Sequence, residues 1–399
     1  MRPHQPVSPA GGGPRGEPAL ARPVAGRAFA VVTGGGTAGH VLPAVAVGEA
    51  LVAHGHQRAT IHYVGAERGI ETRLVPPTGF PHTFLDVVGV QRRLDRSNLS
   101  FTPKLTRAVR QATVLLRGLR PRVVVSVGGY ASLPSVLAAR RLRIPIVAVS
   151  YDRTPGRASR LAARLAAASA VAFPGSGLPR ARVTGAPLRQ EILAVDPARD
   201  RAAARAELAL PEDRFVLLVM GGSLGSAALN AVVEGFVAAC ADRADLAVHH
   251  VAGERYRDDG RAGRELSADA PGRVGGILYR VVGYEDRMPQ AYAAADIVLA
   301  RAGASTVAEL TAVGVPSILV PWPGAAGDHQ TANARPLAEA GAALLIPEAD
   351  LNVARLQREL DRVQLDPATL ARMASAAKAL GAVHRSDALA RLVEEVAQA

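Results

Sequence analysis

A glycine-rich turn followed by a histidine is the first feature that could carry chemistry. The stretch VVTGGGTAGHVLPA, residues 31–44, runs from an apolar pair through Gly34-x-Gly36-x-x-Gly39 into a predicted helix. Glycine removes the side chain, so the free amide groups at the start of the helix can approach an anion such as a phosphate. His40 follows directly, and an imidazole has an unperturbed pKa near neutrality. The turn therefore predicts an anion-binding loop with a candidate proton acceptor beside it.

A nicotinamide cofactor is the other use of such a turn, and the following residues argue against it. In a dinucleotide site, an acid about 20 residues beyond the glycines ends the second strand and binds the ribose hydroxyls. Here, in the stretch TIHYVGAERG, the strand candidate ends at Gly65, Ala66 follows, and the first acid, Glu67, comes late. We therefore expect no cofactor and assign the loop to a diphosphate group of a substrate.

The pattern of a strand, a glycine turn and a helix occurs again later in the chain. AFAVVTGGGTAGHVLPAVAVGEAL and RFVLLVMGGSLGSAALNAVVEGFV share one plan, in which a buried strand leads through a glycine turn into an alanine-rich helix. Two further loops, SVGGYASLPSVLAA and ARAGASTVAEL, have similar chemistry. Two similar domains that face each other across a cleft would suit a substrate that contains a diphosphate.

The elements that must position these loops alternate along the chain. The predicted strands are residues 28–33, 60–65, 123–128, 144–150, 214–220, 246–253, 276–282, 295–300 and 315–322. Amphipathic stretches long enough for a helix lie between most of them, which is typical of parallel sheets with helical crossovers. We predict an α/β fold of two doubly wound, parallel-sheet domains; the alternative is an α+β fold with separated elements.

The chain is predicted to comprise a tail, two domains and a terminal helix. Residues 1–27 are rich in proline, glycine and arginine, which is typical of a disordered tail and not of a signal peptide. A turn-rich and then highly charged segment, residues 185–214, separates the halves. We expect domains over 28–190 and 191–375, and a C-terminal helix over 376–399 that packs back toward the N-terminal domain. No transmembrane segment is expected.

Composition limits the partners and the compartment. The net charge is +12, but aromatic residues amount to only 4%, which is poor material for base stacking, so we expect no nucleic acid and instead an anionic lipid surface or substrate. The single cysteine, Cys240, excludes an intramolecular disulfide and indicates a reducing compartment. No Asp-x-Asp pair is present to hold a divalent cation, so we expect metal-independent chemistry.

Several motifs together resemble one family. GGGTAGHVLPAVAV, VGGYASLP, VTGAPLRQEIL, GGSLGSAALN, ARAGASTVAELTAVGVPSILVPWP and DHQTANA occur in the order and at about the spacing of the MurG family, in glycosyltransferase family 28. The resemblance covers about residue 28 to the C-terminus. It implies a GT-B fold with two Rossmann-like domains, the first on the acceptor and membrane side and the second binding the UDP-sugar.

The resemblance also implies a reaction. N-acetylglucosamine passes from UDP-N-acetylglucosamine to undecaprenyl-diphosphate-linked N-acetylmuramyl-pentapeptide, called lipid I, with inversion at the anomeric carbon and without a metal. Such an enzyme would lie peripherally on the cytoplasmic face of the cell membrane. Its partners would be the two substrates and an anionic membrane surface.

In the first half, the family pattern implies that Thr37, Ala38 and Gly39 lie beside the donor and face the acceptor diphosphate. His40 matches the candidate general base, which would take the proton of the acceptor C4 hydroxyl. The alternative is that His40 only caps the helix or steadies the loop.

In the second half, Arg189 and Ser223 match donor-binding positions and suit phosphate oxygens. Gln330 matches the glutamine that reads the sugar hydroxyls, and the backbone of Tyr284 matches the position that holds the uracil. The segment that matches the uridine and diphosphate site is Ala304, Ser305, Thr306, Val307, Ala308 and Glu309. Glu309 would accept both ribose hydroxyls; the alternative is a first-turn acid that interacts with the helix dipole.

One motif departs from the family pattern. Where family members commonly show His-Glu-Gln-Asn after the fifth strand, this chain has SYDR, residues 150–153. Arg153 takes the place of an asparagine on the donor side of the cleft. Either Asp152 and Arg153 substitute functionally, or the acceptor differs.

A basic segment is the candidate membrane contact. Residues 87–122 mix apolar side chains with Arg92, Arg93, Arg96, Lys104, Arg107 and Arg110 and contain one acid, Asp95. Such a mixture suits peripheral docking on an anionic leaflet. The alternative is an ordinary amphipathic helix with a solvated basic face.

Three functions remain open from the sequence. The preferred one is the lipid I transferase. The second is a related GT-B enzyme with another glycolipid or natural-product acceptor, which the SYDR departure keeps open. The third is a binding protein without catalysis that senses UDP-N-acetylglucosamine, against which the presence of His40 argues.

Overall fold

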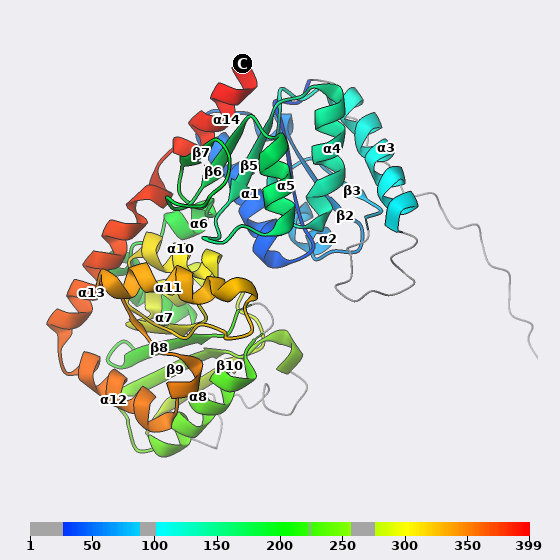
Figure 1. Cartoon of the computed structure of the whole chain (residues 1–399). Helices are drawn as coiled ribbons and strands as arrows, with labels where there is room; N and C mark the ends of the chain where they lie inside the picture. Colours follow the sequence, from blue (N-terminus) through cyan, green and yellow to red (C-terminus); the bar gives the residue numbers. More distant parts are fainter. Residues whose placement is uncertain (1–26, 88–100, 223–224, 257–275) are drawn as a thin grey trace, which may run out of the picture.

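The structure is a computed structural model and describes residues 27–87, 101–222, 225–256 and 276–399. The predicted tail apart from Arg27, the predicted site residue Ser223 and the arginines at 92, 93 and 96 lie outside these residues. The described chain forms two parallel sheets, each with helices on both faces, and Figure 1 shows the two resulting domains one above the other.

The N-terminal sheet has seven parallel strands in the order β3-β2-β1-β4-β5-β6-β7. Their bounds are β1 Ala30–Gly34, β2 Ile61–Ala66, β3 His82–Leu85, β4 Val123–Gly128, β5 Ile146–Ser150, β6 Ala168–Val171 and β7 Ala181–Val183. Strands β1, β2, β4, β5 and β6 are buried along their whole length, as expected for the central strands of a sheet covered on both faces.

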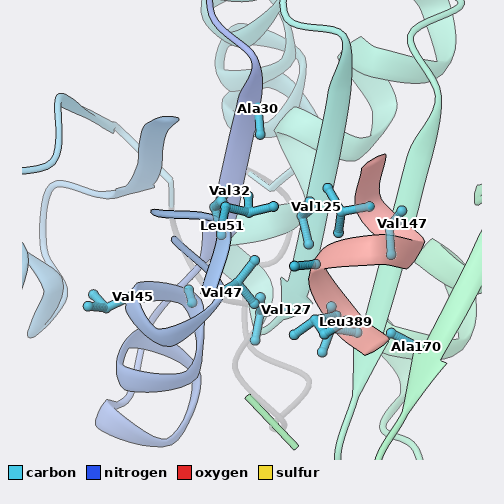
Figure 2. Close-up of a cluster of buried hydrophobic side chains, with 14 of the residues drawn as sticks. Ala30, Val32, Val45, Val47, Leu51, Val125, Val127, Val147, Ala170 and Leu389 are labelled. Carbon is cyan, nitrogen blue, oxygen red and sulfur yellow. The ribbon is translucent and has the colours of Figure 1, made fainter. Parts of the chain in front are cut away.

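Helices cover both faces of this sheet. On one face, α1 (Ala38–Ala53) and α14 (Ala388–Gln398) share a core with side chains from the central strands. Figure 2 shows Val32, Val125 and Val147 of neighbouring strands in one cluster with Leu51 of α1 and Leu389 of α14. The other face is covered by α3 (Phe101–Leu119), α4 (Leu133–Leu142) and α5 (Arg157–Leu165). A short helix, α2 (Glu71–Leu74), follows β2.

The C-terminal sheet has six parallel strands in the order β10-β9-β8-β11-β12-β13. Their bounds are β8 Phe215–Met220, β9 Leu246–Val251, β10 Leu278–Val282, β11 Ile297–Ala300, β12 Ser317–Leu319 and β13 Ala343–Leu345. The helices are α6 Gln190–Leu193, α7 Pro197–Glu207, α8 Ala227–Ala239, α9 Met288–Ala294, α10 Ala304–Val313, α11 His329–Glu339, α12 Val353–Gln364 and α13 Pro367–Gly381. Helices α8 and α12 pack on one face, and α7, α9, α10 and α11 on the other.

The C-terminal residues form two helices and not one. Helix α13 lies in the C-terminal domain and ends at Gly381, where a Cβ atom would come closer than 3.0 Å to the carbonyl oxygen of Thr311. A short 3-10 helix, η8 (Ala382–Arg385), then leads to α14 on the N-terminal domain (Figure 1). Glu394 of α14 accepts hydrogen bonds of 2.8 Å from His54 and His56 at the end of α1.

The chain therefore crosses between the domains twice, at residues 184–189 and at η8. The two crossings touch, because the backbone N–H of Ala186 donates a 2.9 Å hydrogen bond to Nδ1 of His384. His384 is buried, and its burial lowers the pKa of its imidazole to about 4, so the ring stays neutral and can accept this bond.

Each of the nine predicted strands overlaps a strand of the structure, and the doubly wound, two-domain fold is confirmed. Strands β3, β6, β7 and β13 were not predicted. They are three or four residues long and lie at or beside a sheet edge, where a strand needs little of the β-branched signal that marks the sheet centre.

Candidate active site

The glycine-rich loops lie where the strand order reverses in each sheet. Strands β1 and β4 are neighbours at this point in the N-terminal sheet, and β8 and β11 in the C-terminal sheet. Connections from such a pair leave to opposite faces, which opens a crevice at the carboxyl ends of the strands where α/β proteins bind ligands. All four glycine turns noted in the sequence follow these four strands. The topology thus brings them to two facing crevices.

A cavity of about 450 Å³ lies between the two domains and joins these crevices. The predicted site residues that line it are Ala38, Gly39, His40, Arg189, Tyr284, Ala304, Ser305, Thr306 and Glu309. The cavity is thus lined by residues of both domains and by Arg189 of the connecting segment 184–189.

The N-terminal side of the cavity is built by the start of α1. Gly36 has a φ of 94°, a left-handed conformation that favours glycine, and it turns the chain into the helix at Thr37. The Thr37 hydroxyl lies 3.1 Å from Nδ1 of His40. This hydrogen bond occupies one ring nitrogen and leaves Nε2 of His40 as the nitrogen that can take a proton from a ligand.

Asp152 of the SYDR segment lies on the same side of the cavity as His40. The preceding Tyr151 donates its hydroxyl hydrogen bond to the carbonyl oxygen of Gly39, which fixes the end of β5 against the start of α1. Burial lowers the pKa of His40, and the negative charge of Asp152 acts in the opposite direction. Burial raises the pKa of Asp152, and His40 and His329 oppose that shift. Asp152 therefore couples electrostatically to histidines of both domains.

We expect Asp152→Asn to move the acidic limb of the pH profile of kcat/KM to lower pH. The family resemblance implies that His40 is the general base, and a base must be neutral, so we expect activity to fall as the pH drops through the pKa of His40. Removing the negative charge of Asp152 disfavours the imidazolium ion and lowers this pKa further. The measurement is the pH dependence of turnover, with Asp350→Asn, an exposed carboxyl in the C-terminal domain, as the charge-matched control. An unmoved limb in Asp152→Asn would contradict the coupling.

The C-terminal side of the cavity is built by α10. The first backbone N–H that bonds within this helix is that of Val307, which donates to Gly303 at 2.9 Å. The amide groups of residues 304–306 precede it and lie at the positive end of the helix dipole, beside the cavity. This arrangement suits phosphate oxygens.

Glu309 lies one turn further along α10 and is held by Tyr292 of α9. The Tyr292 hydroxyl donates a 2.7 Å hydrogen bond to Oε2 of Glu309. Burial raises the pKa of Glu309, while this hydrogen bond and the positive charge of Arg189 lower it. Tyr292 takes one oxygen, and because Glu309 lines the cavity, its remaining acceptor sites are available to a ligand there.

Two further groups complete the C-terminal side of the cavity. The Arg189 guanidinium forms an ion pair with Glu191, and its buried Nε has no hydrogen-bond partner among the described residues. The loop with Tyr284 is anchored by the next residue, Glu285, whose carboxylate lies 2.9 Å from Nε2 of His249 and accepts a 2.9 Å bond from the N–H of Arg287. Burial alone would raise the pKa of Glu285, but these hydrogen bonds lower it to about 2, so this anchor stays ionised.

Other predicted site residues do not line the cavity. Val307 and Ala308 are fully buried, and their side chains pack in the hydrophobic cores. The Arg153 guanidinium lies 4.6 Å from the centre of the Phe173 ring. Gln330 uses Oε1 to accept a 2.9 Å bond from the N–H of Trp322. Thr37 contacts His40 and not the cavity itself, and Ser223 lies outside the described residues.

Sequence reasoning missed Tyr292, His329 and Glu71. Tyr292 sits in the apolar stretch MPQAYAA, where the only signal is that a buried tyrosine hydroxyl needs a partner. His329 is the second residue of the motif DHQTANA but was not predicted as a site residue, and it lines the cavity. Glu71 follows the late acid Glu67, and only the tertiary structure reveals that it reaches the glycine turn.

The chain is similar to known proteins over most of its length. Residues 30–171 match the glycosyltransferase family 28 N-terminal domain, and residues 216–390 match the family's C-terminal domain. Two relatives named UDP-N-acetylglucosamine--N-acetylmuramyl-(pentapeptide) pyrophosphoryl-undecaprenol N-acetylglucosamine transferase come from Clavibacter michiganensis subsp. michiganensis and Mycobacterium tuberculosis. They are 40% and 42% identical to this chain over 92% of its length, which is 96% and 88% of theirs.

Solved structures give the same result. The crystal structure of Acinetobacter baumannii MurG has a TM-score of 0.67 and 26% identity, and the match covers 94% of this chain and 100% of that one. A glycosyltransferase of kitacinnamycin, with a TM-score of 0.65 and 17% identity, shares the fold. Two Rossmann-like domains with a cavity between them define the GT-B class of glycosyltransferases. The chain belongs to glycosyltransferase family 28, the family of the MurG transferases, so the resemblance noted in the sequence is confirmed.

Proposed function

We propose that this chain transfers N-acetylglucosamine from UDP-N-acetylglucosamine to the C4 hydroxyl of undecaprenyl-diphosphate-linked N-acetylmuramyl-pentapeptide, converting lipid I to lipid II for peptidoglycan. The observation that carries the proposal is that one cavity brings together residues of both domains. His40 of the N-terminal domain lines it together with Glu309 and the start of α10, whose free amide groups suit a phosphate, from the C-terminal domain. The relatives at 40% identity or more, which carry the name of this activity, support it.

In the proposed reaction, the acceptor hydroxyl attacks the anomeric carbon of the donor sugar. The new C–O bond forms as the bond from that carbon to the β-phosphate oxygen breaks, so the configuration inverts and the electron pair leaves with UDP. The hydroxyl proton passes to Nε2 of His40. The amide groups at the start of α10 and the guanidinium of Arg189 stabilise the negative charge on the leaving diphosphate, and Glu309 accepts the ribose hydroxyls.

The second candidate is a GT-B enzyme with a different glycolipid or natural-product acceptor. The SYDR segment favours it, because Asp152 adds a carboxylate to the acceptor side of the cavity, and Arg153 packs over Phe173 and is not among the cavity-lining residues. Both candidates use the same donor site, so only the acceptor separates them.

The test is transfer of radiolabelled N-acetylglucosamine to a short-chain lipid I analogue in the presence of a chelator, with a simple glycolipid as competing acceptor. We expect label in the lipid I analogue alone. Donor binding without transfer to the analogue would refute lipid I as the acceptor but would not contradict the proposed donor site. Loss of transfer with chelator would refute the metal-independent reaction.

We also propose that the chain docks peripherally on the anionic, cytoplasmic face of the cell membrane through α3, α4 and α5. These three helices cover one face of the N-terminal sheet (Figure 1) and contain no aspartate or glutamate. Their exposed cations are Lys104, Arg107, Arg110, Arg117, Arg140, Arg141, Arg157, Arg160 and Arg164. Val114 is 70% exposed and Leu161 39% exposed among them, which suits insertion between lipid headgroups. Among the described helices, none is long and apolar enough to cross a membrane.

The variant with Lys104, Arg107 and Arg110 all changed to glutamate is expected to bind vesicles of anionic lipid at least about 100-fold more weakly. Each basic residue near such a surface contributes about 1 kcal/mol. Co-sedimentation with vesicles measures the change. The control reverses three exposed charges on α12 and α13, Arg358, Arg362 and Arg372. Equal loss in both variants would point to net charge alone and contradict docking by this face.

A further inference from the structure

Glu71 is a buried carboxylate that reaches the glycine turn before α1. It is the first residue of α2 and is 0% exposed. Its Oε1 accepts a 2.8 Å hydrogen bond from the N–H of Ala66, and both carboxylate oxygens lie 3.2 Å from the backbone nitrogen of Gly36. The Gly36 amide, which a glycine turn can offer to a bound phosphate, is therefore taken by a side chain of the protein itself.

Three glycines from separate segments make room for this carboxylate. A Cβ atom on Gly35, Gly65 or Gly69 would come closer than 3.0 Å to the side chain of Glu71. Gly35 belongs to the turn before α1, Gly65 to β2 and Gly69 to the loop after β2. The close approach in all three places explains why these positions carry glycine.

The charge of Glu71 is satisfied by the backbone. Among the described residues, its hydrogen-bond partners are backbone N–H groups only. A buried charge is strongly unfavourable unless hydrogen bonds satisfy it, and converging N–H groups form the kind of concavity that binds anions. The carboxylate of Glu71 thus occupies the Gly36 amide of the glycine turn, in the way that a bound anion would.

The turn is held at two further points. The hydroxyl of Tyr63 donates to the carbonyl oxygen of Gly34, and that of Tyr151 donates to the carbonyl oxygen of Gly39. Glu71 acts between these two points, on the amide of Gly36. The backbone from Gly34 to Gly39 is therefore fixed before any ligand arrives.

We propose that Glu71 is a positioning residue for the acceptor, an internal anion that holds the Gly35-Gly36 turn so that Ala38, Gly39 and His40 face the cavity. The inference rests on the proposed transfer reaction, because it is defined by acceptor turnover. Glu71 is not among the residues that line the cavity. The groups assigned to the uridine and the leaving diphosphate, Glu309, Arg189 and the start of α10, belong to other elements, so we expect the larger effect of Glu71 on the acceptor and the base.

Glu71→Gln tests the role because it keeps the size of the side chain and removes the charge. We expect kcat/KM for the lipid I analogue to fall about 10- to 100-fold, the scale of a small misplacement of reacting groups. The affinity for UDP-N-acetylglucosamine, measured by calorimetry, should stay within about twofold. The acidic limb of the pH profile should also move to lower pH, because the Glu71 charge acts to raise the pKa of His40. The control is Glu67→Gln, an exposed carboxyl in the same loop.

The outcomes separate a positioning role from a general structural one. Unchanged acceptor kinetics in Glu71→Gln, or an equal loss of donor affinity and acceptor turnover, would overturn the proposal. If Glu71→Gln does not fold, Glu71→Asp, which keeps the charge and shortens the side chain, is read by the same criteria. A wild-type protein that binds the donor but ignores the lipid I analogue would instead refute the proposed function.

Discussion

His40→Ala is expected to lower kcat by about 10²- to 10⁴-fold, the usual contribution of a positioned general base. The affinity for UDP-N-acetylglucosamine should remain within about twofold, because the donor groups Glu309 and Arg189 lie on other elements. The physical reason is that the acceptor hydroxyl must lose its proton as it attacks, and His40 lines the cavity while the Thr37 hydroxyl occupies its Nδ1 and leaves Nε2 to accept the proton. Single-turnover transfer and calorimetric donor binding together measure the two quantities.

His40→Gln serves as the matched variant for this experiment. Glutamine can still hydrogen bond to the Thr37 hydroxyl but cannot act as a base near neutral pH. We expect it to lose turnover like His40→Ala and also to lose the acidic limb of the pH profile. Activity near that of the wild type in both variants would remove His40 from the mechanism and leave it as a residue that steadies the loop.

Glu309→Ala is expected to weaken binding of UDP-N-acetylglucosamine by at least about 100-fold. Hydrogen bonds to a charged group contribute about 1.5–3 kcal/mol each, and the carboxylate is expected to accept from the ribose hydroxyls. In this variant the buried Tyr292 hydroxyl loses its 2.7 Å partner as well, so the free energy of unfolding should also fall. Calorimetry with UDP-N-acetylglucosamine and with UDP, and thermal unfolding, measure the two effects.

Two companion variants separate ligand binding from stability. Glu309→Gln keeps an oxygen for Tyr292, so we expect a smaller loss of stability and a persistent loss of donor affinity. Tyr292→Phe removes the group that orients the carboxylate and should weaken the donor by less than Glu309→Ala. A wild-type donor affinity in Glu309→Ala would mean that this carboxylate serves the α10 dipole and Tyr292 only.

Much of the fold follows from local patterns. The central strands, such as β1, β4 and β8, are continuous runs of buried residues rich in valine and leucine, and their burial on both faces produces a signal that a sequence carries by itself. The edge strands β3, β7 and β13 carry a weaker signal because few residues on them are buried against neighbours. The C-terminal helices were predicted as one. Helix α13 ends at Gly381, which approaches the backbone of Thr311, and this long-range contact leaves no local signal in the sequence.

The residues of the candidate site also fall into those that the sequence predicted and those that only the structure identified. The sequence by itself determined the glycine turns, His40 after the first turn, and the α10 start with Glu309, since these depend on neighbouring residues in one strand-turn-helix unit. Only the tertiary structure decided that Val307 and Ala308 enter the core, that Tyr292 holds Glu309, and that the charges of Asp152 and Glu71 act on His40. The reason is that burial, charge coupling and hydrogen bonding depend on atoms brought together from distant segments, and no local pattern records which segments will meet.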